Sequence, residues 1–187
     1  MPTAKERNRG YLKIEGAARA FNFDFGDKTV LDIGSSTGGF TEYALEHGAR
    51  RVIAVEKGSN QMKSPLRHDP RIDLHEKTDI FDIRALSPDV ILADVSFISL
   101  TKILSHVKRH LASSDTDFLV MMKPQFEAGP SQLNHGVVKN DKIRREIIKD
   151  FELWLKQNNF VIIKKRDNDL KGKTGNQERF YWLRKSK

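Results

Sequence analysis

The sequence predicts an α/β fold in which a mostly parallel β-sheet carries helices on both faces. Short, almost wholly apolar runs alternate with amphipathic stretches along most of the 187 residues. Such runs are typical of strands buried on both faces, and their alternation with helices favours parallel pairing. No internal repeat or Gly/Ser linker interrupts the pattern. We therefore expect a single domain over 1–187, with a basic N-terminal segment and helix over 1–25 and a Rossmann-like core over 26–187.

Apolar spacing predicts the elements in order. A helix over 11–25 places on its apolar face Leu12, Ile14, Ala17, Ala18 and Phe21. The next part of the chain predicts a strand over 30–33, a helix over 39–47, and strands over 51–55 and 72–75. The remainder predicts a strand over 90–94, a helix through Ile103 and Val107, a strand over 118–122, a long helix with Ile143, Ile147, Phe151, Trp154 and Leu155 on one side, and strands over 160–163 and 180–183.

The composition excludes several classes of protein. The chain contains no cysteine, which rules out disulfides, thiolate metal sites and cysteine nucleophiles. No apolar run approaches the ~20 residues of a membrane span, and the N-terminus is polar. The six histidines show no spacing typical of metal ligands, so we expect no metal site. Together these features favour a cytoplasmic protein that does not enter membranes.

A positive net charge makes nucleic acid the leading partner class. The sequence has 33 Lys+Arg against 25 Asp+Glu, a formal charge of +8 and an isoelectric point near 9.7. Such a surface attracts phosphates, although many soluble proteins are basic without a specific purpose. Basic residues gather near both ends of the chain, at Lys5, Arg7, Arg9 and Lys13, and at Lys164, Lys165, Arg166, Lys171, Lys173, Arg179, Arg184, Lys185 and Lys187.

A glycine-rich loop follows the first predicted strand, where open α/β sheets bind ligands. It comprises Asp32, Ile33, Gly34, Ser35, Ser36, Thr37, Gly38, Gly39 and Phe40. Ser36 stands where the dinucleotide pattern Gly-x-Gly-x-x-Gly needs its second glycine, so a pyrophosphate cradle is disfavoured. Asp32 suits a ligand with a cationic amino group, such as the methionine end of S-adenosylmethionine. A nucleotide-binding oxidoreductase of the same fold is the rival hypothesis.

Two further carboxylates follow the second and third strands. Glu56 is placed to accept hydrogen bonds from ribose hydroxyls, and Asp79 to meet an adenine amino group. Taken singly, each acid could instead be a helix cap or a solvated carboxylate. Three acids at successive strand ends nevertheless favour a binding site.

Asp94 and Lys123 each come directly after a buried strand. Burying an isolated charge is costly, so we expect them to pair or to face a cleft. They could form an ordinary salt bridge, or the lysine could position and deprotonate a hydroxyl nucleophile. Glu178 could close the same cleft, and Lys13 could join it, although a solvated side chain is the simpler reading for Lys13.

Five sequence motifs together resemble the TlyA or haemolysin A-like ribosomal RNA methyltransferases, relatives of the FtsJ group. They are Arg9-Gly10-x-x-Lys13, the loop over 32–40, Ala93-Asp94-Val95-Ser96-Phe97-Ile98-Ser99-Leu100, Lys123-Pro124-Gln125-Phe126-Glu127, and Lys171-Gly172-x-x-Gly175-Asn176-x-Glu178. Asn8 stands where a serine commonly precedes the Arg-Gly pair, and Glu56 replaces a more frequent aspartate. Family members usually carry an N-terminal S4-type RNA-binding domain, which has no counterpart in these 187 residues.

The resemblance implies 2′-O-methylation of ribose in ribosomal RNA or ribosomal subunits, with S-adenosylmethionine as cofactor. It implies a Lys-Asp-Lys-Glu tetrad of Lys13, Asp94, Lys123 and Glu178, in which Asp94 and Glu178 hold the Lys123 ammonium. The expected cofactor contacts are Asp32, Gly34, Ser35, Thr37, Gly38, Gly39, Phe40, Glu56, Asp79 and Asp94.

RNA is expected to approach over the basic N-terminal segment and the loop over 171–179. The segment over 127–139 is rich in turn-forming residues, so it is expected to act as a mobile flap or, equally, to be a simple surface loop. Two alternatives from other classes are a catalytically silent RNA-binding module and a membrane-lysing protein. The four-residue tetrad argues against the first, and a mean hydropathy of -0.56 argues against the second.

Overall fold

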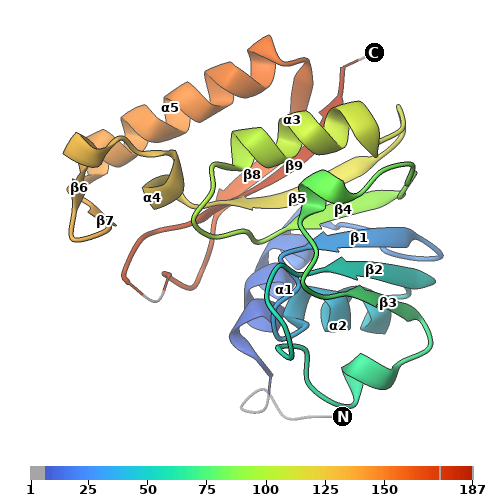
Figure 1. Ribbon diagram of the computed structural model, residues 1–187. Coiled ribbons are helices and arrows are strands. Elements are labelled where there is room, and N and C mark those ends of the chain that lie inside the picture. Colours follow the sequence, from blue (N-terminus) through green and yellow to red (C-terminus); the bar gives the residue numbers. More distant parts are fainter. Residues whose placement is uncertain (1–6, 173, 187) are drawn as a thin grey trace.

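A seven-stranded sheet forms the centre of the protein, as a computed structural model describing residues 7–172 and 174–186 shows (Figure 1). The strand order is β3-β2-β1-β4-β5-β9-β8. The first five strands pair in parallel, and β9 pairs antiparallel with both β5 and β8. The strands are β1 Thr29–Ile33, β2 Arg51–Val55, β3 Ile72–His75, β4 Val90–Ala93, β5 Asp117–Met122, β8 Phe160–Asp167 and β9 Arg179–Lys185. The predicted α/β fold is confirmed.

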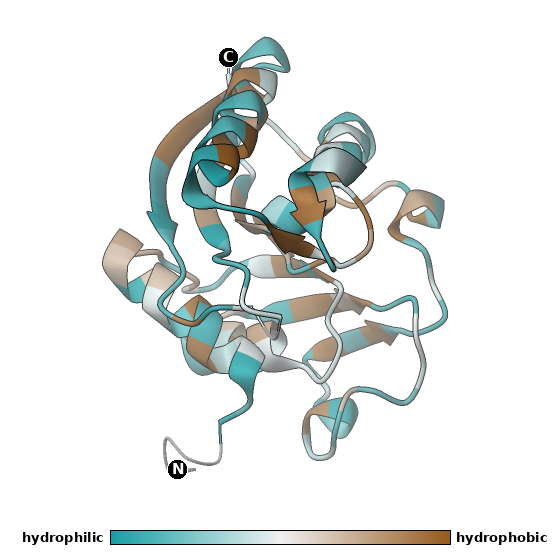
Figure 2. Ribbon diagram, turned by 90° about the vertical axis from the view of Figure 1, so that its left-hand side faces the viewer, coloured by the Kyte–Doolittle hydropathy of each residue, from teal (hydrophilic) through white to brown (hydrophobic). Residues whose placement is uncertain are grey.

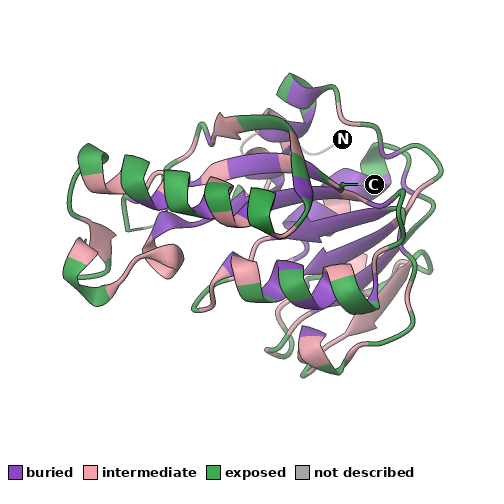
Figure 3. Ribbon diagram, turned by 90° about the horizontal axis from the view of Figure 1, so that it is seen from above, coloured by how far each residue is buried: buried purple, intermediate pink, exposed green. Residues whose placement is uncertain are grey.

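Helices cover both faces of the sheet, because successive strand side chains alternate between two apolar clusters. The helices are α1 Arg9–Phe21, α2 Gly39–Glu46, α3 Leu100–His110, α4 Pro124–Glu127 and α5 Asp141–Gln157. Val30 of β1 packs with α1 and α2, whereas Leu31 packs with α3 and α5. The inner strands β1, β4 and β5 are largely purple in Figure 3, whereas the outer faces of the helices are exposed there and largely teal in Figure 2. Among the described residues, no helix is long and apolar enough to cross a membrane.

The first helix is shorter than the sequence predicts. It begins after Asn8, whose side chain accepts a hydrogen bond from the Tyr11 amide, and ends at Phe21, not at residue 25. Asn22 adopts a left-handed conformation with a φ of 53°, which ends the helix. The apolar residues that follow are core residues in extended chain, and Phe25 packs against Tyr43. Apolar spacing alone does not distinguish a longer amphipathic helix from a shorter helix followed by apolar residues that pack into the core.

The segment over 127–139 contains a small hairpin that the sequence does not predict. Its strands are β6 Leu133–Asn134 and β7 Val137–Val138, preceded by the 3-10 turn η3 Pro130–Gln132. Asn176 fastens this hairpin to the loop before β9: its side-chain oxygen accepts from the Val138 amide at 3.0 Å, and its amide donates to the Gly136 carbonyl at 3.0 Å. Movement of the segment as a flap stays a prediction.

Candidate active site

The glycine-rich loop crosses directly over the end of β4. Gly34 has a φ of +80°, and a Cβ at this position would lie 2.9 Å from the Asp94 carbonyl oxygen. The loop is held there by the Gly34 amide, which donates to the Val55 carbonyl at 2.9 Å. A glycine is therefore required, because a side chain would collide with backbone. This close approach brings the loop after β1 to Asp94, as expected for a site at the strand ends.

Asp32 is a fully buried carboxylate with one unsatisfied oxygen. Its Oδ2 accepts from the Thr41 hydroxyl at 2.6 Å, whereas its Oδ1 has no hydrogen-bond partner among the described residues. Burial, with smaller effects from Asp94 and Glu56, raises the pKa of Asp32 to about 7, despite the opposing hydrogen bond from Thr41. The hydroxyl of Ser35 is likewise buried without a partner in the described part of the chain. Two orphaned buried polar groups fit a polar, cationic ligand.

Glu56 braces the glycine-rich loop from the end of β2. One carboxylate oxygen accepts from the Ser36 amide at 2.9 Å, and the other accepts from the Gly58 amide at 2.6 Å. The Oε1 atom also accepts from the Gln61 side-chain amide at 3.3 Å, so Oε2 is the oxygen that keeps a second lone pair for a ribose hydroxyl. The expected ribose contact stays a prediction, and the structure adds a positioning role that the sequence does not reveal.

The next residues of the loop pack the helices together. A Cβ on Gly39 would lie 2.2 Å from the Asn8 side-chain oxygen and 2.6 Å from the Tyr11 amide nitrogen, so α1 and α2 meet closely there. Gly38 has a φ of +91°, and Phe40 is buried against Phe180. Thr37 lines a surface groove beside α2. Contacts of these four residues with a cofactor stay predictions, and Gly39 and Phe40 have a packing role as well.

Asp79 caps the 3-10 turn η2 Ile80–Asp82. Its Oδ1 accepts from the Phe81 amide at 3.2 Å, and its Oδ2 lies 2.9 Å from the Lys57 ammonium. The hydrogen bond from Lys57 lowers the pKa of this carboxyl. The interpretation of Asp79 as a helix cap is thus confirmed. Its contact with an adenine stays a prediction.

Asp94 and Lys123 form an ion pair at the ends of adjacent parallel strands. The Lys123 ammonium lies 2.6 Å from Asp94 Oδ1 and donates to the Ser96 hydroxyl at 2.8 Å. Lys123 is only 9% exposed. The strand register accounts for the pairing, since β4 and β5 run side by side up to Ala93 and Val120. The expected proximity of these two charges is present.

Lys13 and Glu178 form the second ion pair. Their side chains meet at 2.6 Å, and both are buried. Glu178 does not have the expected contact with Lys123. Instead Lys13 reaches it from α1, and Ser96 becomes the second partner of Lys123. The expectation that Lys13 is solvated is wrong. The close packing of α1 on α2 places its side chain against Glu178, which directly precedes β9. The tetrad thus consists of two ion pairs.

A carboxylate that the sequence analysis did not single out ties the loops after β4 and β5 together. Glu127 accepts from the Ser99 hydroxyl at 2.6 Å and from the Leu100 amide at 2.7 Å, which caps α3. Burial raises the pKa of Glu127. In the same pair of loops, Phe97 is 93% exposed, has a φ of +65° and lies with its ring 5.3 Å from that of Phe126. An exposed aromatic ring in a strained backbone conformation beside a partly buried ion pair is typical of a contact surface.

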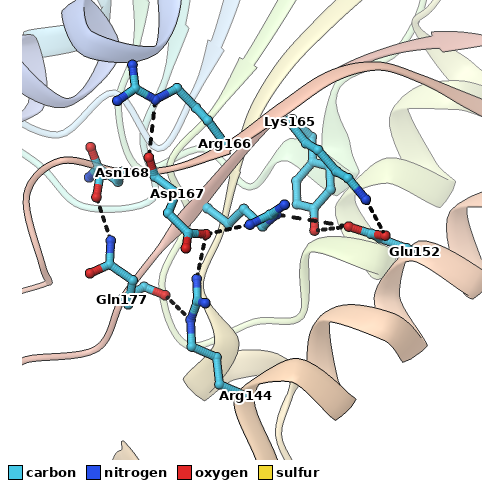
Figure 4. Close-up of polar contacts among 9 residues, drawn as sticks. Arg144, Glu152, Lys165, Arg166, Asp167, Asn168 and Gln177 are labelled. Atoms are coloured by element: carbon cyan, nitrogen blue, oxygen red, sulfur yellow. Dashed lines mark hydrogen bonds and ion pairs between the residues drawn. The ribbon is translucent and has the colours of Figure 1, made fainter. Parts of the chain in front are cut away.

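Internal pairing engages most of the cations near the C-terminal end. Asp167 binds both Arg144 at 2.7 Å and Arg179 at 2.6 Å (Figure 4). Arg144 also donates to the Gln177 carbonyl at 3.1 Å, which fixes the chain next to Glu178. Other internal partners are found for Lys164, Lys165, Arg166, Arg184 and Lys185. Lys5, Lys173 and Lys187 lie outside the described residues.

Comparison with known proteins identifies the family. A model of FtsJ-like methyltransferases matches residues 6–185. The chain belongs to the FtsJ-like methyltransferase family. TlyA of Mycobacterium tuberculosis, a 16S/23S rRNA (cytidine-2′-O)-methyltransferase, is 36% identical over 185 residues, covering 95% of this chain and 68% of that protein. Hemolysin A of Brachyspira hyodysenteriae is 35% identical over 177 residues, covering 91% of this chain and 73% of that protein.

A solved structure supports the same relationship. A Streptococcus thermophilus protein described as a hemolysin superposes with a TM-score of 0.92 at 32% identity, covering 99% of this chain and 69% of that one. The resemblance that the sequence motifs indicated is thereby confirmed, and so is the Rossmann-like methyltransferase fold. S-adenosylmethionine is the cofactor of this FtsJ-like methyltransferase, and the orphaned groups of Asp32 and Ser35 fit it.

Proposed function

We propose that this FtsJ-like methyltransferase methylates ribose 2′-hydroxyls of ribosomal RNA in the cytoplasm. The observation that carries the proposal is the presence of two ion pairs, the partly buried Asp94–Lys123 and the buried Lys13–Glu178, at the carboxyl ends of the parallel strands. Support comes from TlyA of Mycobacterium tuberculosis, whose name gives this reaction on cytidine.

We assign one set of residues to binding the cofactor and another to positioning and deprotonating the ribose hydroxyl. S-adenosylmethionine, when bound, supplies a methyl group on a positively charged sulfur that is already an activated leaving group. Asp32 and Ser35 would hold its polar end, and Glu56 and Asp79 its nucleoside. Because no metal is needed to activate such a methyl group, the chain has only to align the nucleophile and remove its proton.

Lys123 is the residue that we assign to the hydroxyl. Its ammonium is fixed by Asp94 and Ser96, so its position is defined before RNA arrives. We infer that Lys123 first releases a proton to solvent, and that its neutral amine then orients the 2′-oxygen and takes the hydroxyl proton as the bond to carbon forms. Lys13 and Glu178 complete the wall of the site and restrict the direction from which the ribose can enter.

The RNA is proposed to reach the site over Phe97 and the loop before β9. Aromatic rings stack on unpaired bases in a way that tolerates any base, and Phe97 is exposed next to the Asp94 loop. Lys171, which has no acidic partner in the described chain, lies exposed in the loop before β9. A base held by Phe97 would leave its ribose near Lys123.

Methyl transfer to ribosomal subunits tests the proposal directly. The protein is incubated with radiolabelled S-adenosylmethionine and unmethylated 30S or 50S subunits, and the labelled position is mapped. We expect label on ribose, and none with the Lys123→Ala variant. Label on a base instead of ribose, or no transfer to either subunit by a protein that binds the cofactor, would refute the proposal.

A further inference from the structure

Helix α5 carries an exposed row of cations for which the site described above has no use. They are Lys142, Arg145, Lys149 and Lys156, called here the α5 stripe. At 100° per residue, the four positions fall within about 60° of the helix circumference, and they extend over about 21 Å. Figure 3 shows the outer surface of α5 exposed along its length.

The α5 stripe differs from most of the described cations near the C-terminal end in having no acidic partner. Across residues 7–172 and 174–186, no carboxylate lies within 4 Å of any of the four side chains, although Glu146 and Asp150 are on the same helix. By contrast, the described cations from Lys164 onward other than Lys171 are paired or hydrogen-bonded. The α5 stripe is therefore a row of cations without acidic partners in the described chain, whereas near the C-terminal end such cations are scattered among paired ones, as Lys164 and Lys185 show.

The arrangement is unfavourable for the helix itself. Arg145 and Lys149 are like charges at i,i+4 spacing, which destabilises a helix. Lys142 lies in the first turn, where the helix dipole disfavours a cation, whereas Lys156 lies in the last turn, where a cation is favourable. Helix stability therefore does not account for Lys142, Arg145 and Lys149, and these three exposed charges indicate an anionic partner.

The stripe begins beside the proposed active site. Arg144, the neighbour of Arg145, contacts the Gln177 carbonyl directly before Glu178. The hairpin β6–β7, which precedes α5, is fastened to the same loop by Asn176. An RNA strand that leaves the site over this loop therefore meets the N-terminal end of α5 first.

We propose that the α5 stripe binds the phosphate backbone of ribosomal RNA flanking the methylated nucleotide. The inference rests on the proposed function and adds a second contact surface to it. Phosphate contacts contribute affinity and register without reading sequence. They also make binding depend on salt, because each neutralised phosphate releases counterions.

A matched pair of triple variants tests the inference. The test variant is Lys142→Gln/Arg145→Gln/Lys149→Gln, and the control is Arg19→Gln/Lys28→Gln/Arg50→Gln, which removes the same charge. The control residues lie on α1 and next to the amino ends of β1 and β2, away from the site. Binding to unmethylated 30S and 50S subunits is measured from about 50 to 200 mM salt, with S-adenosylmethionine affinity measured alongside.

We expect the test variant to lose at least about tenfold in affinity for its subunit and to lower the salt slope by about 2 to 3, while the control stays near the parent. Cofactor affinity and the melting temperature should not fall in the test variant. Equal losses in both variants, or an unchanged slope in the test variant, would overturn the inference. If the parent methylates ribose while the test variant binds normally, the inference fails and the proposed function stands.

Discussion

Replacing Asp32 by asparagine should stabilise the protein while weakening its binding of cofactor. The carboxylate is fully buried, and one of its oxygens has no partner in the described chain. Its pKa of about 7 in the folded protein compares with an ordinary value of 3.8. This difference corresponds to about 4 kcal/mol of unfavourable free energy when the group is ionised.

The sign of the pH dependence follows from the raised pKa. Well below its ordinary pKa of 3.8 the group is protonated in both the folded and unfolded states, so its ionisation has no effect on stability. Between pH 3.8 and about 7 the unfolded state ionises Asp32 while the folded state keeps it protonated, so stability falls over this range and the full loss is reached above pH 7. An asparagine side chain cannot ionise, and its amide oxygen can still accept from Thr41. The Asp32→Asn variant should therefore gain up to about 4 kcal/mol at pH 8 and less than half of that at pH 5.

Urea unfolding at pH 5 and pH 8 without cofactor measures this gain, with Asp115→Asn, an exposed carboxylate, as the control. Calorimetry at pH 8 should show at least about tenfold weaker binding of S-adenosylmethionine, because the cationic amino group loses its counter-charge. A variant no more stable than the parent at pH 8, or a gain that does not shrink at pH 5, would refute the burial argument. Unchanged cofactor affinity would refute the assignment of Asp32 to the ligand.

Four further substitutions test other parts of the site. Lys123→Ala should reduce methyl transfer by about 10² to 10⁴-fold with cofactor affinity nearly intact, whereas Asp94→Ala should reduce both methyl transfer and cofactor affinity. Single-turnover rates measure the transfer, and calorimetry measures the affinity. A Lys123→Ala enzyme with more than about a tenth of parental turnover would contradict the role of Lys123 as general base. Gly39→Ala should lower the free energy of unfolding by about 1 to 3 kcal/mol, because its Cβ meets the Tyr11 backbone; denaturation curves that coincide with the parent would contradict the close packing of α1 on α2. Glu127→Ala should cost about 1 to 3 kcal/mol and slow transfer, since it leaves the Leu100 amide without its cap; unfolding and turnover that both match the parent would show that the brace has no effect.

Local patterns in the sequence were sufficient to predict the strands and the positions of the charged residues that follow them. Apolar runs mark buried strands, and a charge directly after such a run has to lie at a sheet edge, which placed Asp94 and Lys123 together. The register of β4 and β5 then makes the pairing almost unavoidable.

Contacts between distant segments could not be predicted in this way. Lys13 pairs with Glu178 only because α1 lies tightly on α2, and that approach depends on Gly39 having no side chain. The hairpin β6–β7 has two residues in each strand, too few to show a period of two. Similarly, nothing in the run of basic residues near the C-terminal end shows which of them meet acids such as Asp167.

The place of β9 in the sheet affects the order in which the protein can assemble during synthesis. β8 joins the sheet only through β9, which follows it in the chain. The sheet therefore stays incomplete, with β5 as an open edge, until β9 has been synthesised. The Lys13–Glu178 pair closes a separation of 165 residues, so the site forms among the last and least local contacts. A nascent chain that ends before Glu178 would expose an unpaired strand edge and would leave Lys13 without its acidic partner.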